Sequence, residues 1–110
     1  MIGALDSNTT ISLAPPTDLT ATAASSSQIN LAWKAAAGAT DYEVERSLSS
    51  TSGWTEIATT TSTSDSDTGL TAGTTYYYRV IATGGGLSST PSNTASATTS
   101  GGTGTIGSTS

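Results

Sequence analysis

The sequence predicts an all-β fold, an antiparallel sandwich of about seven short strands without a disulfide. Three observations support this prediction. Apolar and polar residues alternate in several short segments, as they do in strands with one buried face. Clusters of Ser, Gly, Asn and Pro separate these segments at intervals of roughly 8–12 residues. No segment carries the period of about 3.6 residues that marks an amphipathic helix.

The first half of the predicted domain contains three alternating segments. Ser25 to Gln28 separates the first two as a turn. Residues 34–40 are rich in Ala and Gly, and they are too short and too poorly capped for a helix, so we expect a loop. The inward positions of the three strands are, in order, Leu19, Ala21 and Ala23, then Ile29, Leu31 and Trp33, then Tyr42 and Val44.

The second half continues the pattern. Trp54 to Thr59 is the next strand, and the polar residues 60–66 leave room for a short one. The longest strand runs from about Thr75 to Thr83, a flexible glycine turn follows it, and residues 92–99 form the last strand. In the longest strand Tyr76, Tyr78, Val80 and Ala82 face one side, whereas Tyr77, Arg79 and Ile81 face the other.

The turn before the longest strand carries specific chemistry. Tyr76 follows Leu70 by six residues at a strand start, which predicts a tyrosine corner whose hydroxyl bonds the backbone near Leu70. Gly73 is expected to relieve a backbone angle that other residues disfavour. Asp67 is expected to cap the turn with its carboxylate.

The predicted core is thin. The chain has no Phe, Cys or His, but it has 24 Thr and 19 Ser. Trp33 is expected to fill the space between the sheets, together with Tyr78 and Val80. Without a disulfide, these aromatic residues have to tie the two sheets together.

The 110 residues divide into one domain and two tails. Residues 1–14 form a leader, residues 15–99 the domain, and residues 100–110 a linker of Gly, Ser and Thr with one Ile. In the leader, Thr9 to Ala14 alternates in a way that is compatible with an extra strand. Asn8 begins an Asn-Thr-Thr glycosylation sequon, a tripeptide that is common by chance. No signal peptide is visible.

Charge excludes several classes of function. The formal net charge is −5, with three cations and eight carboxylates. Three cations cannot neutralise a row of phosphates, so no nucleic acid partner is expected, and an anionic membrane is disfavoured for the same reason. No run of apolar residues is long enough to span a bilayer. Without His or Cys, the sequence predicts neither a zinc site nor a Ser-His-Asp triad.

Two acidic patterns are candidates for a chemical site. Glu43 and Glu45 lie two residues apart on one strand, a spacing of roughly 6.5–7 Å that glycoside hydrolysis could use. We interpret them instead as a solvated outer face with Arg79 as their partner on the neighbouring strand. Asp65 to Gly69 resembles the start of a calcium loop, but its twelfth position is Tyr76 rather than Glu. The sequence therefore predicts no catalytic residue, no metal and no cofactor.

Two aromatic residues are the candidate ligand contacts. Trp54 and Tyr77 are expected to be partly exposed, and aromatic rings of this kind stack on sugars. The favoured interpretation is structural: Trp54 folds over the sheet edge, and Tyr77 packs against Arg79 and its strand neighbours.

Taken together, the residues resemble a fibronectin type III domain of the kind found in bacterial extracellular carbohydrate-active enzymes. The resemblance covers Pro16 to about Thr99, some three-quarters of the chain. Its pieces stand in the family's order, namely Pro16-Thr17-Asp18-Leu19-Thr20-Ala21, Ile29-x-Leu31-x-Trp33, Tyr42-x-Val44-x-Arg46, Asp67-x-Gly69-Leu70-x-x-Gly73-Thr74-x-Tyr76-x-Tyr78-Arg79-Val80-x-Ala82, and Ser89-x-Pro91-Ser92-Asn93 followed by Ala95-x-Ala97-Thr98-Thr99. The chain departs from the family at Ala72, where proline is common, and at Ala23, Ala95 and Ala97, where larger residues are common.

The resemblance implies a non-catalytic spacer module of a secreted or surface multidomain protein, with neighbouring domains of its parent chain as partners. Such modules separate a catalytic domain from a polysaccharide-binding domain. The residues leave two alternatives open. One is a subunit of an extracellular filament, in which residues 9–14 add as a strand to a copy of the chain. The other is an accessory module that binds polysaccharide weakly through Trp54 and Tyr77.

Overall fold

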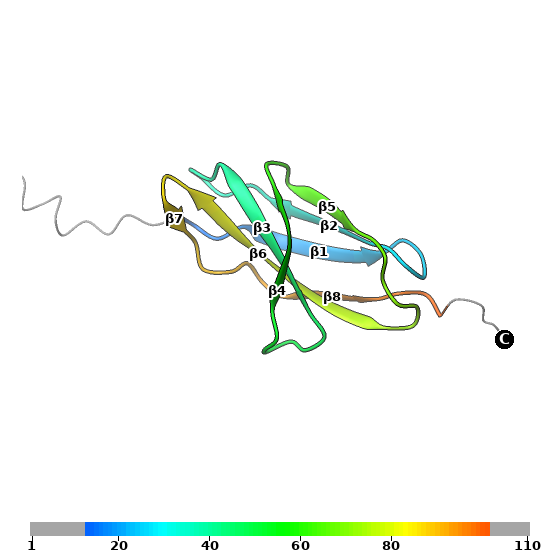
Figure 1. Cartoon of the computed structure of the whole chain (residues 1–110). Coiled ribbons are helices and arrows are strands. Elements are labelled where there is room, and N and C mark those ends of the chain that lie inside the picture. Colours follow the sequence, from blue (N-terminus) through cyan, green and yellow to red (C-terminus); the bar gives the residue numbers. More distant parts are fainter. Residues whose placement is uncertain (1–12, 102–110) are drawn as a thin grey trace, which may run out of the picture.

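A computed structural model describes residues 13–101, which form an antiparallel β-sandwich (Figure 1). The sequence prediction of an all-β sandwich is confirmed. The described residues contain eight strands and no helix, so no helix among them could cross a membrane. The strands are β1 (Thr17–Ala23), β2 (Ile29–Lys34), β3 (Asp41–Ser47), β4 (Thr55–Thr60), β5 (Ser64–Asp67), β6 (Thr75–Gly84), β7 (Leu87–Ser88) and β8 (Ala95–Thr98).

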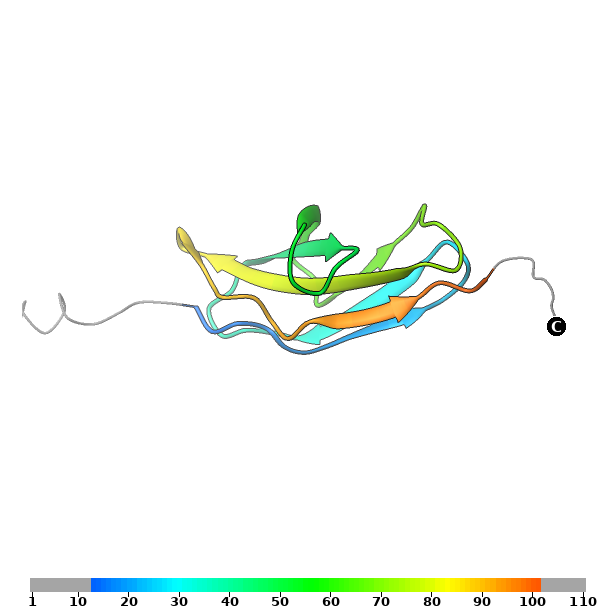
Figure 2. The ribbon, with the colours of Figure 1, turned by 90° about the horizontal axis from the view of Figure 1, so that it is seen from below.

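The strands form two layers, which Figure 2 shows edge-on. One sheet has the order β1-β2-β5. The other has the order β4-β3-β6-β7, and β8 also pairs with β6. All of these pairings are antiparallel. β6 is therefore the centre of the larger sheet, with β3 on one side and β7 and β8 on the other.

The core lies between the two sheets and contains the predicted inward residues. Trp33 is 6% exposed, and its ring meets that of Tyr42 edge-on with the centroids 5.7 Å apart. Ala23, Ala95 and Ala97 are only partly buried against this cluster. A chain without Phe thus closes its core with one buried indole, three buried tyrosines and smaller residues. The side chains with no exposed surface include Ile29, Val44, Tyr78 and Val80.

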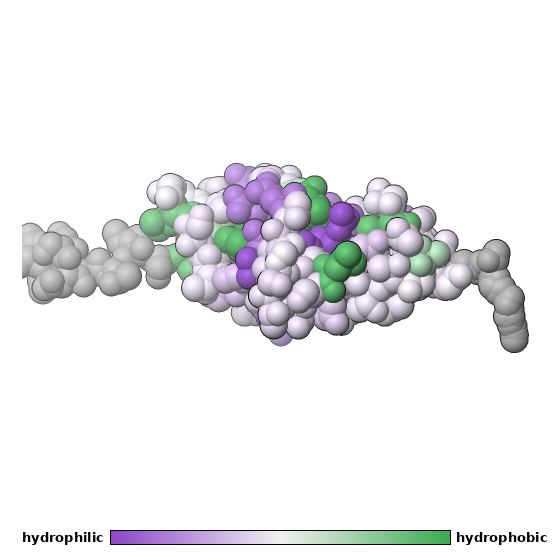
Figure 3. Space-filling model, turned by 60° about the horizontal axis from the view of Figure 1, so that its bottom comes forward, coloured by the Kyte–Doolittle hydropathy of each residue, from purple (hydrophilic) through white to green (hydrophobic). Residues whose placement is uncertain are grey.

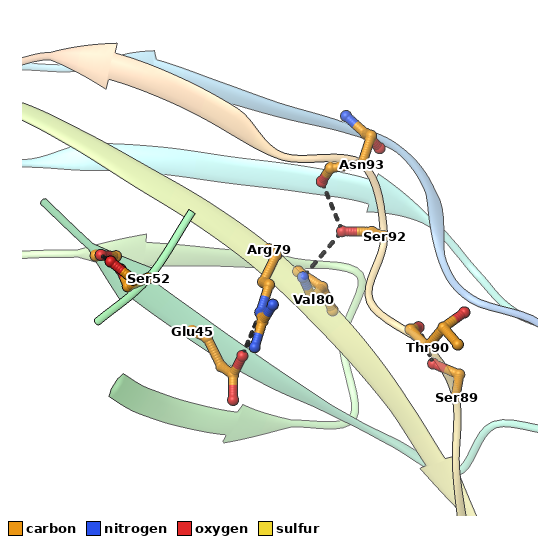
Figure 4. A network of polar contacts seen from close by, with 9 residues as sticks. Glu45, Ser52, Arg79, Val80, Ser89, Thr90, Ser92 and Asn93 are labelled. Carbon is orange, nitrogen blue, oxygen red and sulfur yellow. Dashed lines mark hydrogen bonds and ion pairs between the residues drawn. The ribbon is translucent and has the colours of Figure 1, made fainter. Parts of the chain in front are cut away.

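The last predicted strand, residues 92–99, is shorter in the structure, where β8 covers only Ala95–Thr98, and β7 is an additional two-residue strand before it. β7 and β8 are separated by Ser89 to Thr94, in which Pro91 has no N–H to donate to a ladder. The hydroxyl of Ser92 accepts a hydrogen bond from the Val80 N–H at 2.9 Å (Figure 4), and the hydroxyl of Ser89 does the same for Ala82. Two serine side chains thus satisfy the β6 donors across the gap.

Most of the predicted leader strand lies outside the described residues, and so does Asn8. The last two residues of that segment, Leu13 and Ala14, are not in a strand. Leu13 packs against the core of its own domain, and a Cβ on Gly38 would lie 3.2 Å from its side chain.

Candidate functional site

The corner before β6 has the geometry of a tyrosine corner. The backbone N–H of Thr71 donates to the Tyr76 hydroxyl at 3.0 Å, one residue beyond Leu70. Gly73 has a φ of 62°, a left-handed value that favours glycine. The Leu70 N–H donates to Ser27 in the β1–β2 turn at 3.0 Å. The corner is therefore attached to the opposite sheet as well as to its own strand.

Asp67 does not cap the turn as the sequence suggested. It is 7% exposed, and both of its carboxylate oxygens lie 3.0 Å from Arg46 Nη1. The Tyr78 hydroxyl also donates to Asp67, at 2.7 Å. Burial, together with this bond to a carboxylate, holds the pKa of Tyr78 far above its ordinary value. Because Asp67 belongs to β5 and its partners to β3 and β6, the cluster joins the two sheets.

The outer face of the larger sheet contains the expected ion pair between acid and arginine. Glu45 lies opposite Arg79 in the β3–β6 ladder and accepts a hydrogen bond from Arg79 Nε at 2.5 Å (Figure 4). The pair is more covered than a solvated surface pair, because the Glu45 side chain is only 17% exposed. Glu43 lies opposite Ile81 instead. The two acids therefore do not share the arginine, and Glu45 is engaged in an ion pair.

Trp54 and Tyr77, the candidate ligand contacts, are both partly buried. The guanidinium carbon of Arg79 lies 4.5 Å from the centroid of the Trp54 ring, so the cation covers one face of the indole. Tyr77 lies opposite Ser47 and Ser96 in the sheet. The covered indole weakens the case for sugar stacking, which stays a prediction.

Both ends of the domain are attached to the sandwich. At the first, Pro16 is fully buried, and the Asn93 side chain makes two 3.0 Å bonds to the backbone of Leu19, one accepted and one donated. At the second, Thr99 is 2% exposed and its hydroxyl donates to the Thr71 carbonyl at 2.6 Å. The first and last described residues lie at opposite ends of the sandwich (Figure 1).

Sequence reasoning missed the roles of Arg46, Asp67 and Asn93. Local spacing contains no signal for these contacts, since Arg46 and Asp67 are 21 positions apart and Leu19 and Asn93 are 74 apart. Residues 13–101 contain no group of three acidic, His or Cys side chains that could hold a metal ion. All three cations of these residues are in ion pairs. Arg46 and Arg79 form the pairs described above, and Lys34 Nζ lies 3.1 Å from Asp18. These contacts bind elements of the fold to each other.

The face of the molecule that Figure 3 shows is mostly of intermediate hydropathy. In the space-filling view of Figure 3, pale residues dominate, polar side chains gather in the middle of the face, and apolar ones form separate spots. Leu48 is the one large apolar side chain of the described residues that is strongly exposed, at 70%. The visible face therefore presents no large continuous apolar area of the kind that marks a tight interface.

Comparison with known proteins identifies one family. The fibronectin type III domain model matches residues 14–98. A poly(3-hydroxybutyrate) depolymerase of Ralstonia pickettii is 42% identical over 87 residues, which are 76% of this chain and 16% of that enzyme. The chain thus spans about one-sixth of the length of this curated relative.

Solved structures give the same result. An Fn3-like protein from Clostridium thermocellum is 43% identical with a TM-score of 0.74, over 78% of this chain and 92% of that one. Titin domains A168–A170 are 26% identical with a TM-score of 0.73, over 81% of this chain and 32% of theirs. A beta-1,2-glucanase from Parabacteroides distasonis is 27% identical with a TM-score of 0.72, and the match covers 81% of this chain and 13% of that enzyme.

Proposed function

Because this chain belongs to the fibronectin type III family, we propose that it is a non-catalytic spacer module of a secreted or surface multidomain protein. The observation that carries the proposal is the attachment of both ends of the domain at opposite ends of the sandwich. A neighbour joined at either end would meet a fixed surface, so the sandwich would set the distance between its neighbours.

The relatives support the setting. Two of the similar proteins are named as enzymes that cut a polymer, and the match covers 16% of one and 13% of the other. A module that makes up so small a share of an enzyme leaves room for separate catalytic and binding domains. We therefore place this module in a secreted polymer-degrading enzyme, where it separates such domains. The low charge and the many Ser and Thr residues suit an extracellular surface.

Two of the described acids support a non-catalytic role. Glu45 is bonded to Arg79, and Asp67 is bonded to Arg46 and Tyr78. A general acid or base has to reach a substrate proton at hydrogen-bond distance. Carboxylates that are already engaged inside the fold are poorly placed for that task.

The spacer proposal is tested by measuring the distribution of distances between the two ends of the domain. The chain has no Cys, so Ala14→Cys with Gly101→Cys places one fluorophore pair at the exposed ends of the domain. Single-molecule energy transfer should give one narrow distance. Thr22→Cys with Thr59→Cys, at two exposed strand positions, supplies the width expected for a rigid pair. A broad distribution for the end pair alone would overturn the proposal.

Two further measurements separate this proposal from its rivals. The isolated chain should release no product from poly(3-hydroxybutyrate) or from a glucan, and hydrolysis of either would show an enzyme. Light scattering should give a monomer, whereas assembly into filaments would favour strand exchange between copies.

A further inference from the structure

An open groove of about 710 Å³ lies between the β3–β4 connection and the tyrosine corner. Its walls include Arg46, Leu48 and Thr55 on one side and Thr71, Thr74 and Tyr76 on the other. The volume lies within the range of about 300–1,000 Å³ that is typical of small-molecule sites. The groove therefore has room for a short segment of a chain-like ligand.

The rim of the groove is held in place by local hydrogen bonds. The Ser47 hydroxyl donates to the Ser52 carbonyl and accepts from the Ser49 N–H at 3.0 Å. The Ser49 hydroxyl accepts from the Thr51 N–H at 3.2 Å. Opposite, the corner is held by Tyr76 and Thr99. Both walls are thus formed before any ligand arrives, which lowers the entropic cost of binding.

The hydrogen-bond donors of the groove favour a ligand that has hydrogen-bond acceptors and no donors. Arg46 is the one charged residue that residues 13–101 contribute to the lining, and an arginine has donors but no acceptor. Both of its bonds to Asp67 come from Nη1, and within residues 13–101 neither Nη2 nor Nε donates a hydrogen bond. Among the described residues, the lining contains no carboxylate and no side-chain amide. The hydroxyls of the lining can accept from a sugar or a peptide, but Arg46 can pair only with an acceptor, and an ester group brings acceptors alone.

Charge and apolar contacts narrow the chemical class of the ligand further. Asp67 already balances the Arg46 charge, so a neutral carbonyl suits the site better than a dianion. The Arg46 guanidinium lies over the Tyr76 ring, with its carbon 5.5 Å from the centroid, so this ring face is not open for sugar stacking. Leu48 is 70% exposed at the rim and can cover an aliphatic carbon chain.

We propose that this groove binds a short aliphatic segment of a hydroxy-acid polyester. An ester carbonyl accepts from the unused N–H groups of Arg46, the Ser and Thr hydroxyls donate to further ester oxygens, and the carbon chain lies against Leu48. The proposal rests on the proposed function, because a spacer in a polymer-degrading enzyme works beside its polymer. The spacer would then also hold a strand of substrate near its C-terminal end.

The test is a titration of the isotope-labelled chain with the methyl ester of the linear 3-hydroxybutyrate dimer, followed by amide chemical shifts. Shifts confined to residues 46–55 and 71–76 are expected. Leu48→Ser and Thr55→Glu change exposed groove positions and should each weaken binding at least threefold. Thr22→Glu, at an exposed position of the other sheet, should not. Shifts elsewhere, or none at millimolar ester, would overturn the proposal.

Three additional binding experiments identify the ligand and its source. The free acid of the dimer should bind as well as its methyl ester, and binding of the acid alone would show an anion site instead. Cello-oligosaccharide should not compete, and preferential sugar binding would overturn the polyester assignment. Retention on a poly(3-hydroxybutyrate) film that Thr55→Glu reduces would identify the solid polymer as the source rather than free oligomers. None of these outcomes alters the distribution of distances between the two ends of the domain. The spacer proposal and the groove proposal can therefore be refuted independently.

Discussion

Arg46 and Asp67 form an ion pair between the two sheets. Arg46 Nη1 lies 3.0 Å from both Asp67 oxygens, and the aspartate side chain is 8% exposed. A carboxylate this buried needs partners, because desolvation of an unpaired charge costs several kcal/mol. With the Tyr78 hydroxyl as a second donor, the pair is a polar connection in a domain that has no disulfide.

Replacement of this carboxylate should destabilise the domain. Asp67→Asn leaves the Arg46 guanidinium without its counter-charge, and we expect a loss of about 2–3 kcal/mol in the free energy of unfolding by urea. This value is below that of a fully buried pair because the Arg46 side chain is 32% exposed to water. Asp18→Asn breaks the exposed pair with Lys34 and should cost less than about 0.5 kcal/mol. Equal losses for the two variants would contradict a structural role for Asp67.

Replacement of Asp65, two residues before Asp67, should stabilise the domain at neutral pH. Burial is the main reason why the pKa of Asp65 is raised, and repulsion from Asp67 adds to the effect. A raised folded-state pKa means that the contribution of Asp65 to stability is present below its unfolded-state pKa and is lost as the pH rises through the folded value. Asp65→Asn should therefore raise the urea midpoint at pH 7 and have little effect at pH 3. A lower midpoint at pH 7 would show that the charge is favourable.

The hydroxyl of Tyr78 should govern stability in alkali. Its pKa is held well above the ordinary value of about 10 by burial and by the bond to Asp67. Its stabilisation is therefore complete below about pH 10 and is lost as the pH rises beyond that value. Tyr78→Phe should cost about 1–2 kcal/mol at pH 7, and the difference from the natural chain should shrink by pH 11. A constant difference across this range would contradict the assignment.

The parts of the fold that the sequence predicted are those encoded locally. The alternation around Trp33 and the spacing from Leu70 to Tyr76 each lie within one segment, and the structure contains both. Asp67 stands before Thr and Gly, so local chemistry indicated a turn cap. Its real partner, Arg46, comes from the other sheet. The groove could not be predicted either, because it forms between two loops that only the folded sandwich brings together.

Asn93 should control how firmly β1 is attached to the rest of the domain. Its side-chain oxygen accepts from the Leu19 N–H and its amide donates to the Leu19 carbonyl, each at 3.0 Å. Asn93→Asp keeps the acceptor and loses the donor, whereas Asn93→Ala loses both. We expect losses of about 1 and about 2 kcal/mol in the free energy of unfolding, respectively.

Amide hydrogen exchange gives the direct measurement. The Leu19 amide should exchange faster in Asn93→Ala than in Asn93→Asp, because only the latter still accepts its hydrogen bond. Thr94→Ala, at the exposed neighbouring position, should leave the rate unchanged. The amide of Thr71, which is bonded to Tyr76 near the opposite end, should keep its protection in all three variants. If Leu19 stayed equally protected in Asn93→Ala, the pairing of β1 with β2 alone would hold this end of the sandwich.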